Sequence, residues 1–380
     1  MLIPKLNFLG GVERVFAEFL RYLSAQGYEV HVICEQIDPG LRPYCASIDY
    51  LKQRKPILRY FPLLSRLSWM TRCTHLLKKK GLDDALVIAP PGGGPWYVNF
   101  AFAGSCHLAS LLVSAKYGSW KWLLNPFHYV ICLTEWYCFN YGSKKVLVPS
   151  GRTGLELEKY YGVSSKKIIV LPHGVDTELF HPLADDARKE LRAKESIAPN
   201  AFVLLTVTNE VERKGCFLVL DALKELLSQG KSIQYRIVGR DNYSKIQSYA
   251  ASIGVEHAVQ FLPPRSGDGL IEQFQAADAF ILPTFYESFG LVGMEALSCG
   301  VPLIATQVGG IEDYLKDGEV GMFCLRNSKD IQAKVAYLID HPDQRVKIAQ
   351  SARLHAQTYA WYQVLEQLKK LVDNDLLPTP

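Results

Sequence analysis

Two glutamates separated by eight positions, Glu287 and Glu295, lie in the part of the chain that is richest in chemical signals. An apolar run over 279–282 precedes them and predicts a buried strand, which Pro283 ends because proline cannot donate to a ladder. Apolar side chains then recur at helical spacing over 291–298, so a helix should follow, with both carboxylates on roughly one face. A strand that leads into a helix presents backbone N–H groups at the carboxyl edge of a sheet, where open α/β sheets bind ligands.

A second candidate lies at the start of another predicted helix. Arg213 and Lys214 precede Gly215, between a strand over 202–207 and a helix that runs to Leu227. Two cations beside the N–H groups of a helix start can hold a diphosphate. A solvated pair of loop charges would have the same pattern, so both interpretations stay open at this point.

Two further candidates lie in the first half of the chain. Gly10 and Gly11 form a turn before a helix over 12–23, and a strand follows that helix, so this βαβ unit contains either a phosphate-binding turn or a plain loop. His107 follows a strand over 98–103. A histidine just past a strand end faces the ligand crevice more often than it faces the core, which makes His107 a candidate for chemistry.

The residue patterns predict no metal site. The nine cysteines are odd in number and lack a C-x-x-C pair, and some of them, such as Cys34 and Cys132, fall in apolar strand patterns. Reduced, buried thiols explain this distribution. Asp373 and Asp375 match a D-x-D pattern, but they lie in a polar C-terminal stretch that we expect to be solvated. We therefore expect no metal ligands.

The elements that must position these residues alternate between strand and helix along 380 residues, a length that suits two domains. Besides the strands named above, short apolar runs predict strands over 29–34, 85–90, 129–134, 145–148, 168–171, 235–239, 259–262 and 303–306. Amphipathic repeats predict helices over 185–194, 270–277 and 361–371. The chain should therefore fold as α/β domains.

The stretch around Glu287 resembles a known family. Glu287 and Glu295 form an E-x7-E motif with Pro283 before it, Ser288-Phe289-Gly290 inside it and Gly300-Val301-Pro302 after it. This combination is similar to that of the retaining glycosyltransferases of family 4, among which the bacterial lipopolysaccharide-core glucosyltransferases look most similar. The resemblance implies the GT-B fold: two Rossmann-like, doubly wound domains facing a central cleft, with a C-terminal helix crossing back to the first domain.

The resemblance also implies domain boundaries. Residues 1–176 would form the acceptor-binding domain, residues 177–360 would form the nucleotide-sugar-binding domain, and residues 361–380 would pack back on the first domain. The family usually has a longer strand before its glycine turn than this chain shows. The first strand here should therefore be short or mis-started.

Carried over residue by residue, the resemblance assigns roles in the site. Glu287 and His107 become the catalytic candidates, because Glu287 would hold hydroxyls of the transferred sugar and His107 would lie beside that sugar. Arg213, Lys214 and the glycine turn would stabilise the leaving diphosphate without a metal. Glu295 would accept hydrogen bonds from both ribose hydroxyls. The full set of donor-binding residues would be Gly10, Gly11, Arg213, Lys214, Ser288, Phe289, Gly290, Leu291 and Glu295.

The expected function is that of a retaining hexosyltransferase. It would move a hexose from a UDP- or GDP-linked sugar to a glycan or lipid-linked acceptor in cell-envelope glycan synthesis, by front-face attack and with no cofactor. Two alternatives stay open: a phosphorylase- or epimerase-like GT-B enzyme with a soluble substrate, and a non-catalytic nucleotide-binding or lipid-surface module. The presence of Glu287, Arg213 and Lys214 argues against the second alternative.

Charge and aromatic residues indicate a surface partner for the first half of the chain. The stretch 51–82 holds basic residues and no acidic one, and 116–129 combines tryptophan and tyrosine with lysine, as at membrane interfaces or in a packed helical connection. We expect contact with an anionic membrane and not with nucleic acid, because no nucleic-acid-binding motif appears and the second half is acidic. Without a bilayer-spanning run or a signal-peptide pattern, we expect a cytoplasmic protein peripherally bound to the inner face of the membrane.

Overall fold

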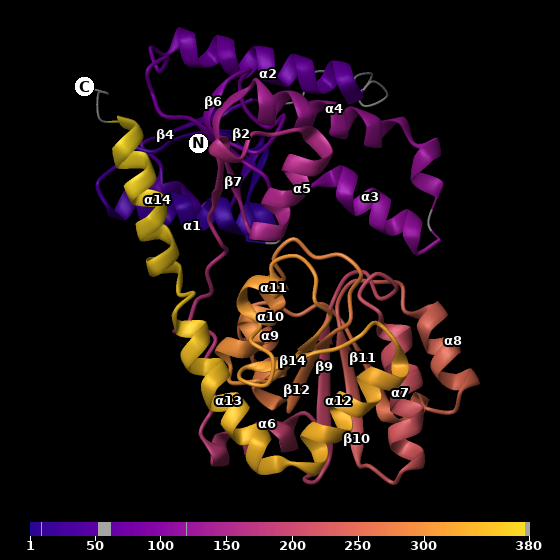
Figure 1. The fold of residues 1–380 in the computed structure, drawn as a ribbon. Coiled ribbons are helices and arrows are strands. Elements are labelled where there is room, and N and C mark those ends of the chain that lie inside the picture. The colour runs from indigo at the N-terminus through magenta and orange to yellow at the C-terminus, as the bar shows by residue number, and fades with distance from the viewer. Residues whose placement is uncertain (9, 52–61, 119, 377–380) are drawn as a thin grey trace. The chain divides into compact units, whose positions relative to one another are not determined.

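The computed structural model describes residues 1–8, 10–51, 62–118 and 120–376, and the chain forms two compact units (Figure 1). Unit 1 comprises Met1–His173 and Trp361–Pro380, and unit 2 comprises Gly174–Ala360. We expected domain boundaries after residues 176 and 360, and the units divide after His173 and after Ala360. Each unit has parallel strands and helices in alternation, as the sequence patterns predict.

Unit 1 is built on short parallel strands. Its four-stranded sheet has the order β5-β6-β7-β8, and β2 pairs with β4 and β1 with β3. The segment 1–3 connects β2 to β5, because the N–H of Leu2 donates to the carbonyl of Ile88 at 3.0 Å and the N–H of Ile3 donates to that of Ile33 at 3.1 Å. The elements are β1 (Lys5–Leu6), α1 (Gly11–Ala25), β2 (His31–Cys34), β3 (Gln36–Ile37), β4 (Ser47–Tyr50), α2 (Pro62–Lys79), β5 (Ile88–Ala89), β6 (Val98–Phe102), α3 (His107–Lys116), the 3-10 helix η3 (Lys121–Leu124), α4 (Pro126–Asn140), β7 (Ser143–Val148), α5 (Gly151–Tyr161) and β8 (Ile168–Val170).

One predicted strand of unit 1 is wrong, because the run 129–134 lies inside helix α4. Asn125 caps this helix by accepting a hydrogen bond from the N–H of Phe127 at 3.0 Å. Pro126 occupies the first turn, where its missing N–H costs nothing. A short apolar run cannot by itself distinguish a strand from a helix segment. Cys132, which we expected in that strand, therefore lies on α4, where it is half-buried.

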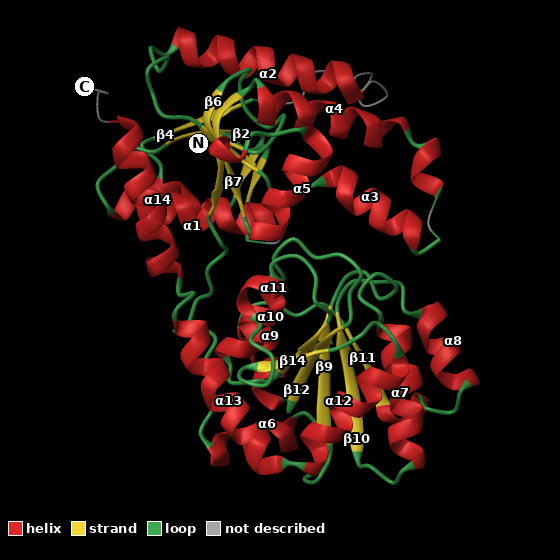
Figure 2. Ribbon diagram, in the orientation of Figure 1, coloured by secondary structure: helices red, strands yellow, loops and turns green. Residues whose placement is uncertain are grey.

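Unit 2 is a doubly wound α/β domain with helices on both faces of its sheet (Figure 2). The six parallel strands have the order β11-β10-β9-β12-β13-β14, so β9 and β12 are central. All four residues of β12 are buried, as expected for a strand covered on both faces. The elements are α6 (Asp185–Lys194), β9 (Phe202–Val207), α7 (Cys216–Ser228), β10 (Ile233–Val238), α8 (Ser244–Ser252), β11 (Val259–Leu262), α9 (Asp268–Ala276), β12 (Ala279–Leu282), α10 (Leu291–Ser298), β13 (Leu303–Ala305), α11 (Ile311–Tyr314), β14 (Gly321–Phe323), α12 (Ser328–Asp340) and α13 (Pro342–Gln357).

The C-terminal helix α14 (Trp361–Leu376) belongs to unit 1, as expected. Its apolar stripe, which includes Val364, Leu365 and Leu368, is part of the core that α1 also enters. The expectation that Asp375 is solvated is wrong, because its side chain is only 9% exposed and accepts a hydrogen bond from Nδ2 of Asn99 at 2.8 Å. A polar stretch near a chain end becomes ordered when its apolar stripe docks on a core.

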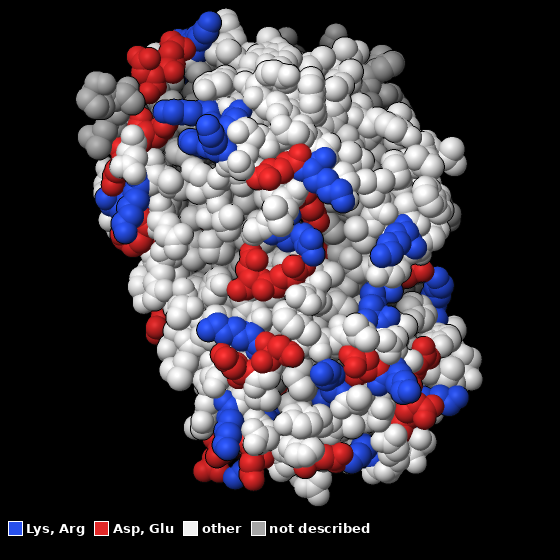
Figure 3. Space-filling model, in the orientation of Figure 1, with Lys and Arg blue, Asp and Glu red and all other residues white. Residues whose placement is uncertain are grey.

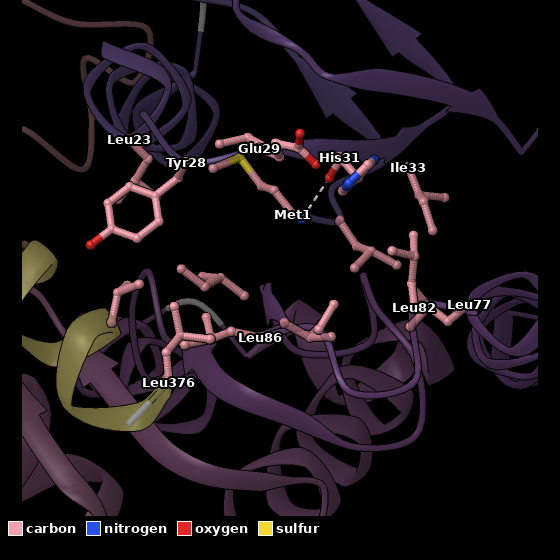
Figure 4. Close-up of a pocket in the computed structure, with 16 residues that line it drawn as sticks. Met1, Leu23, Tyr28, Glu29, His31, Ile33, Leu77, Leu82, Leu86 and Leu376 are labelled. Atoms are coloured by element: carbon pink, nitrogen blue, oxygen red, sulfur yellow. Dashed lines mark hydrogen bonds between the residues drawn. The ribbon is translucent and has the colours of Figure 1, made fainter. Parts of the chain in front are cut away.

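An apolar pocket of about 300 Å³ lies in unit 1 at the amino ends of β2 and β5 (Figure 4). Leu23, Leu77 and Leu376 line it from the ends of α1, α2 and α14. Beside the pocket, the ammonium of Met1 donates to the carbonyl of His31 at 2.8 Å, and burial lowers the pKa of this ammonium to about 5. Parallel sheets bind ligands at the carboxyl ends of their strands. This pocket lies at the amino ends, which is the opposite edge from the ligand site predicted for unit 1.

Candidate active site

Three turns of unit 2 meet at the carboxyl edge of its sheet. β9 leads through 208–215 into α7, β12 leads through 283–290 into α10, and β13 leads through 306–310 into α11. Figure 2 shows the loops of unit 2 gathered at this end of the strands. Because β9, β12 and β13 are adjacent parallel strands, residues from distant parts of the sequence become neighbours at this edge.

Lys214 and Glu287 form a buried ion pair at this edge. Nζ of Lys214 donates to Oε2 of Glu287, and the two side chains are 9% and 14% exposed. Burial by itself would raise the pKa of Glu287, but the positive charges of Lys214 and Arg213 outweigh burial and hold that pKa below its usual value. Glu287 is therefore an ionised hydrogen-bond acceptor at neutral pH.

Arg213 supports the same turn through the main chain. Its Nη1 donates to the carbonyl of Tyr286 at 2.6 Å, and its Nη2 donates to Oε2 of Glu210 at 2.6 Å. Gly215 has a φ of 75°, and a Cβ there would lie 2.5 Å from the carbonyl oxygen of Pro283. Only a glycine permits this close approach of the two turns. The structure thus brings together Arg213, Lys214 and Glu287, which the sequence pointed to separately.

A third turn, which sequence reasoning left without a role, holds the Glu287 turn in place. Gly309 has a φ of 56°, and a Cβ there would lie 1.4 Å from the carbonyl oxygen of Glu287. The N–H of Gly310 donates to the carbonyl of Ser288 at 3.0 Å, and the hydroxyl of Tyr314 donates to the carbonyl of Gly290 at 3.1 Å. The two consecutive glycines in the turn between a strand and a helix were the available signal for this contact.

The two glutamates of the E-x7-E motif do not share a helix, so the expectation of one helical face is wrong. Gly290, with a φ of 87°, is the N-cap of α10, and Glu287 lies in the turn before it. Glu295 lies within α10 and is 2% exposed. The left-handed backbone at Gly290 changes the chain direction, which sequence spacing cannot show.

The other predicted donor-binding residues of this turn divide by exposure. Ser288 and Leu291 are half-buried. Phe289 is 1% exposed, and its ring packs on that of Tyr314 with 5.3 Å between centroids. The side chain of Phe289 therefore anchors the turn in the core.

Two helix starts of unit 1 lie side by side. Gly10 is the N-cap of α1 and Gly11 its first residue. A Cβ on Gly104 would lie 2.5 Å from Cγ2 of Val12, so the loop between β6 and α3 lies against the first turn of α1. His107 is the first residue of α3. The structure therefore places the loop that leads to His107 against the helix that follows the glycine turn.

His107 is held by two residues of α4. Its Nε2 shares a hydrogen bond with Nδ1 of His128 at 3.0 Å, and the two rings stack with centroids 5.1 Å apart. Its main-chain N–H donates to Oε2 of Glu135 at 3.1 Å. Burial, and then the nearby His128 and Arg66, lower the pKa of His107 to about 4, so its imidazole is neutral at physiological pH.

Glu135 is buried beneath the start of α3. Its Oε2 also accepts from the hydroxyl of Tyr161 at 2.8 Å, and burial raises its pKa to about 7. Sequence reasoning missed His128 and Glu135 because it assigned 129–134 to a strand. On a helix, residues seven positions apart lie on one face, so recognition of α4 would have revealed the pair.

Among the described residues, no three His, Cys, Asp or Glu side chains are grouped so that they could hold a metal ion. The nine cysteines are thiols, and seven of them are buried, with Cys45 and Cys132 the half-buried exceptions. The arrangement at the edge of unit 2 instead offers two cations, an ionised carboxylate and helix starts. Such a set can bind a phosphorylated ligand that also carries hydroxyl groups.

Two family models match the chain. One, described as "Glycosyl transferases group 1", matches residues 187–355, and the other, described as "Glycosyltransferase Family 4", matches residues 9–179. The first match falls within unit 2 and the second falls almost entirely within unit 1. Unit 2 is thus similar to glycosyl transferases of group 1, and unit 1 is similar to glycosyltransferases of family 4.

Curated relatives of known name align with part of the chain. The D-inositol 3-phosphate glycosyltransferase of Corynebacterium urealyticum is 31% identical over 235 residues, which are 59% of this chain and 54% of that protein. The enzyme of the same name from Corynebacterium aurimucosum is 29% identical over 234 residues, 60% of this chain and 56% of that protein. The chain spans about half the length of the curated relatives it matches.

Solved structures match nearly the whole chain. WaaG, a glycosyltransferase involved in lipopolysaccharide biosynthesis, superposes with a TM-score of 0.78 at 21% identity, covering 97% of this chain and 98% of that one. The sucrose-phosphate synthase of Thermosynechococcus elongatus has a TM-score of 0.79 at 18% identity, covering 98% and 95%. HepE of Anabaena, in complex with UDP-glucose, has a TM-score of 0.73 at 15% identity, covering 98% and 99%. At these identities the matches show the fold, which is the two-domain GT-B fold.

Proposed function

We propose that this protein is a retaining glycosyltransferase that moves a hexose from a UDP- or GDP-linked sugar to a glycan or lipid-linked acceptor in cell-envelope glycan synthesis. The observation that carries the proposal is the cluster of Arg213, Lys214 and Glu287 at the carboxyl edge of the sheet in unit 2. The matched domains, the UDP-glucose bound to HepE and the role of WaaG in lipopolysaccharide biosynthesis support it.

The ion pair prepares the site for a donor that is both charged and hydroxylated. In the free protein, Lys214 and Glu287 neutralise each other in a buried position. A diphosphate at the start of α7 takes over Lys214 and Arg213 as partners, and sugar hydroxyls donate to the carboxylate of Glu287. Each buried charge then exchanges one partner for another, so donor binding leaves none unpaired.

The transfer itself needs stabilisation of the leaving diphosphate and removal of one proton. The bond between the sugar C1 and the phosphate oxygen breaks, and the acceptor oxygen attacks C1 from the same face. The acceptor proton passes to an oxygen of the leaving phosphate, so atoms and charge balance. Arg213 and Lys214 stabilise the negative charge that develops, which is the task a metal ion performs in other enzymes.

The exposed apolar surface of unit 1 supports adsorption to a membrane. Trp120, Leu124 and Phe127 in the stretch 116–129 are 59%, 88% and 41% exposed. Figure 3 shows charges of both signs interspersed over unit 2, whereas the face over α2 and α4 is mostly uncharged. Among the described residues, no helix is long and apolar enough to cross a membrane. We infer that this stretch rests in the interface of an anionic membrane where a lipid-linked acceptor is found.

The basic stretch 51–82 contributes less to that surface than its composition suggests. Its residues Lys52, Arg54, Lys55 and Arg59 lie outside the described residues. Arg66, near the start of α2, lies 5.9 Å from the ring of Phe127 in the aromatic stretch. Lys78 and Lys79 lie at the other end of that helix. At ~1.5 Å per residue, the two ends of α2 are well separated, so these two lysines are far from Phe127. Lys80, just beyond, pairs with Asp49 at 2.7 Å. The aromatic stretch is therefore the principal membrane contact in our proposal.

A panel of nucleotide sugars tests the proposed function. The protein is incubated with UDP- and GDP-linked hexoses in excess chelator, with and without a lipid-linked glycan acceptor, and nucleotide release is measured. Slow release without acceptor and faster release with it, with retained configuration in the product, support the proposal. Turnover that needs inorganic phosphate, epimerisation without nucleotide release, or no reaction with any donor contradicts it. If activity is lost in chelator and magnesium restores it, only the metal-free nature of the transfer step is contradicted.

A further inference from the structure

Helix α4 holds the start of α3 at two points. His128 shares a hydrogen bond of 3.0 Å with the imidazole of His107. Glu135, which lies seven residues later on the same helix face, accepts a hydrogen bond of 3.1 Å from the main-chain N–H of His107. Because Glu135 also accepts from Tyr161 of α5, the carboxylate joins three helices. His107 is thus fixed in both its backbone and its ring by groups outside its own helix.

The contact between the two histidines restricts the chemistry of His107. A bond between two imidazoles requires one ring to donate an N–H and the other to accept through a bare nitrogen. With Nε2 of His107 engaged, Nδ1 is its only nitrogen left for other work. Which nitrogen of a histidine carries the proton is set by the hydrogen bond that the other nitrogen makes. His128 therefore determines the form of His107 that a ligand meets.

We propose that His128 is a positioning residue, which holds the imidazole of His107 in one tautomer and one orientation at the start of α3. The proposal rests on the proposed function and on the place beside the transferred sugar that the family resemblance implies for His107. His128 itself has no place there, because it acts only through the ring of His107. It belongs to the aromatic stretch 116–129, so one residue links that exposed stretch to the site.

Substitutions at His128 separate a positioning role from a merely structural one. Asparagine places a polar atom near the position of Nδ1, glutamine extends one toward the position of Nε2, and leucine fills the space without any hydrogen bond. In His128→Leu we expect kcat to fall about tenfold or more, with KM for the nucleotide sugar within about twofold, because a misplaced group lowers turnover. His128→Asn should recover most of kcat, and His128→Gln should recover less.

Nitrogen NMR of the histidine rings tests the pair without any substrate. In the wild-type protein, His107 should populate one tautomer, and in His128→Leu it should become a mixture of two. The acid limb of kcat should also move to higher pH in His128→Leu, because one group that opposes protonation of His107 is lost. The other charged and titratable groups near His107 stay in place: Arg66 on α2, and Glu135 on α4 with its partner Tyr161 on α5.

Each result decides a different point. An unchanged tautomer of His107 in His128→Leu overturns the proposal, whatever the enzyme transfers. A changed tautomer with unaltered kcat, or equal loss in the leucine and asparagine variants, also overturns the positioning role. Failure of the proposed function appears elsewhere, as wild-type protein without transferase activity, and leaves the NMR result to decide whether the pair orients His107. Thermal unfolding of each variant shows whether it folds.

Discussion

Lys214 and Glu287 are separated by 73 residues in the sequence and share one buried contact. Two buried charges stabilise each other only as a pair, because each alone would lack the solvation that it had in water. This explains why Glu287 stays ionised although it is buried. In our proposal, the nucleotide sugar replaces the internal partners of these charges when it binds.

Removal of either cation should impair turnover. We expect Lys214→Ala and Arg213→Ala each to lower kcat ~100-fold or more, because the leaving diphosphate loses charge stabilisation. Lys231→Ala, which removes a surface lysine paired with Asp340 in the same unit, should leave kcat unchanged. Near-normal turnover in both site variants would exclude these residues from a diphosphate cradle.

Stability separates the role of the pair in folding from its role in turnover. Lys214→Met alone leaves Glu287 buried without its partner and should cost about 3 kcal/mol or more in the free energy of unfolding. The double variant Lys214→Met/Glu287→Gln should recover much of that loss in urea unfolding while turnover stays low. A double variant as unstable as the single one would show that the ion pair is not the source of the cost.

The pH dependence of stability should contain a contribution from Glu287. Its pKa in the folded protein lies below the usual value of 4.5, so it stabilises the fold above that pH and the contribution is lost as pH falls through the lower, folded pKa. Between pH 6 and pH 3, the free energy of unfolding should therefore fall more steeply in the wild-type protein than in Glu287→Gln. Parallel curves would contradict the lowered pKa.

At the scale of elements, three strand-to-helix turns define the site, and glycines allow them to touch. Gly215 approaches Pro283, and Gly309 approaches Glu287, at distances that no Cβ permits. Both glycines have positive φ, so the backbone conformation and the close approach each require a residue without a Cβ. In unit 1, Gly104 likewise allows the loop before α3 to lie against α1.

Gly309→Ala should disturb the Glu287 turn more than the backbone strain of a positive φ would by itself, because the new Cβ also meets the carbonyl oxygen of Glu287. Gly318 provides a matched control, because it has a φ of 78° but a Cβ there would meet no heavy atom within 4 Å among the described residues. We expect Gly318→Ala to cost about 1 kcal/mol and Gly309→Ala about 3 kcal/mol or more, measured by urea unfolding. Gly309→Ala should also lower turnover. Equal costs for the two variants would argue that the contact with Glu287 is unimportant.

At the scale of the whole molecule, the two units differ in surface as well as in sequence. Unit 2 carries the charged cluster at the end of a large, fully covered sheet, and unit 1 carries smaller sheets and the exposed aromatic stretch 116–129. Exposed tryptophan and leucine beside one another are unusual on a surface that meets only water. This division suits a protein that takes a soluble donor in one unit and a lipid-linked acceptor in the other.

Vesicle binding tests that division. We expect co-sedimentation with anionic but not with zwitterionic vesicles, weakened by salt because exposed charges are screened within ~8 Å at physiological ionic strength. Trp120→Ser and Leu124→Ser should reduce the part of binding that survives salt. Leu325→Ser, at a leucine of unit 2 that is 68% exposed, should not. Replacing Lys78, Lys79 and Lys80 together by serine should have a smaller effect. Binding that ignores lipid charge, or no binding, would favour a soluble acceptor.

Local sequence patterns were sufficient for most of the elements and for the identity of the residues at the edge of unit 2. The strands over 202–207, 259–262 and 279–282 and the helix over 185–194 have the predicted bounds. Buried parallel strands read as apolar runs and helices read as amphipathic repeats, so this information is local. The family resemblance around Glu287 added the fold that the structural matches show.

Contacts between distant residues needed the tertiary structure. The pairing of Lys214 with Glu287, the support from Gly309, and the two bonds from α4 to His107 all depend on which strand ends and helices become neighbours. The run 129–134 shows the limit of local patterns, since its apolar residues suit a strand, but the cap at Asn125 and packing in unit 1 make it a helix. The sequence by itself thus determined which residues could do chemistry. The packing of parallel strands and their helices decided which of these residues meet, because contact depends on position in space and not on spacing along the chain.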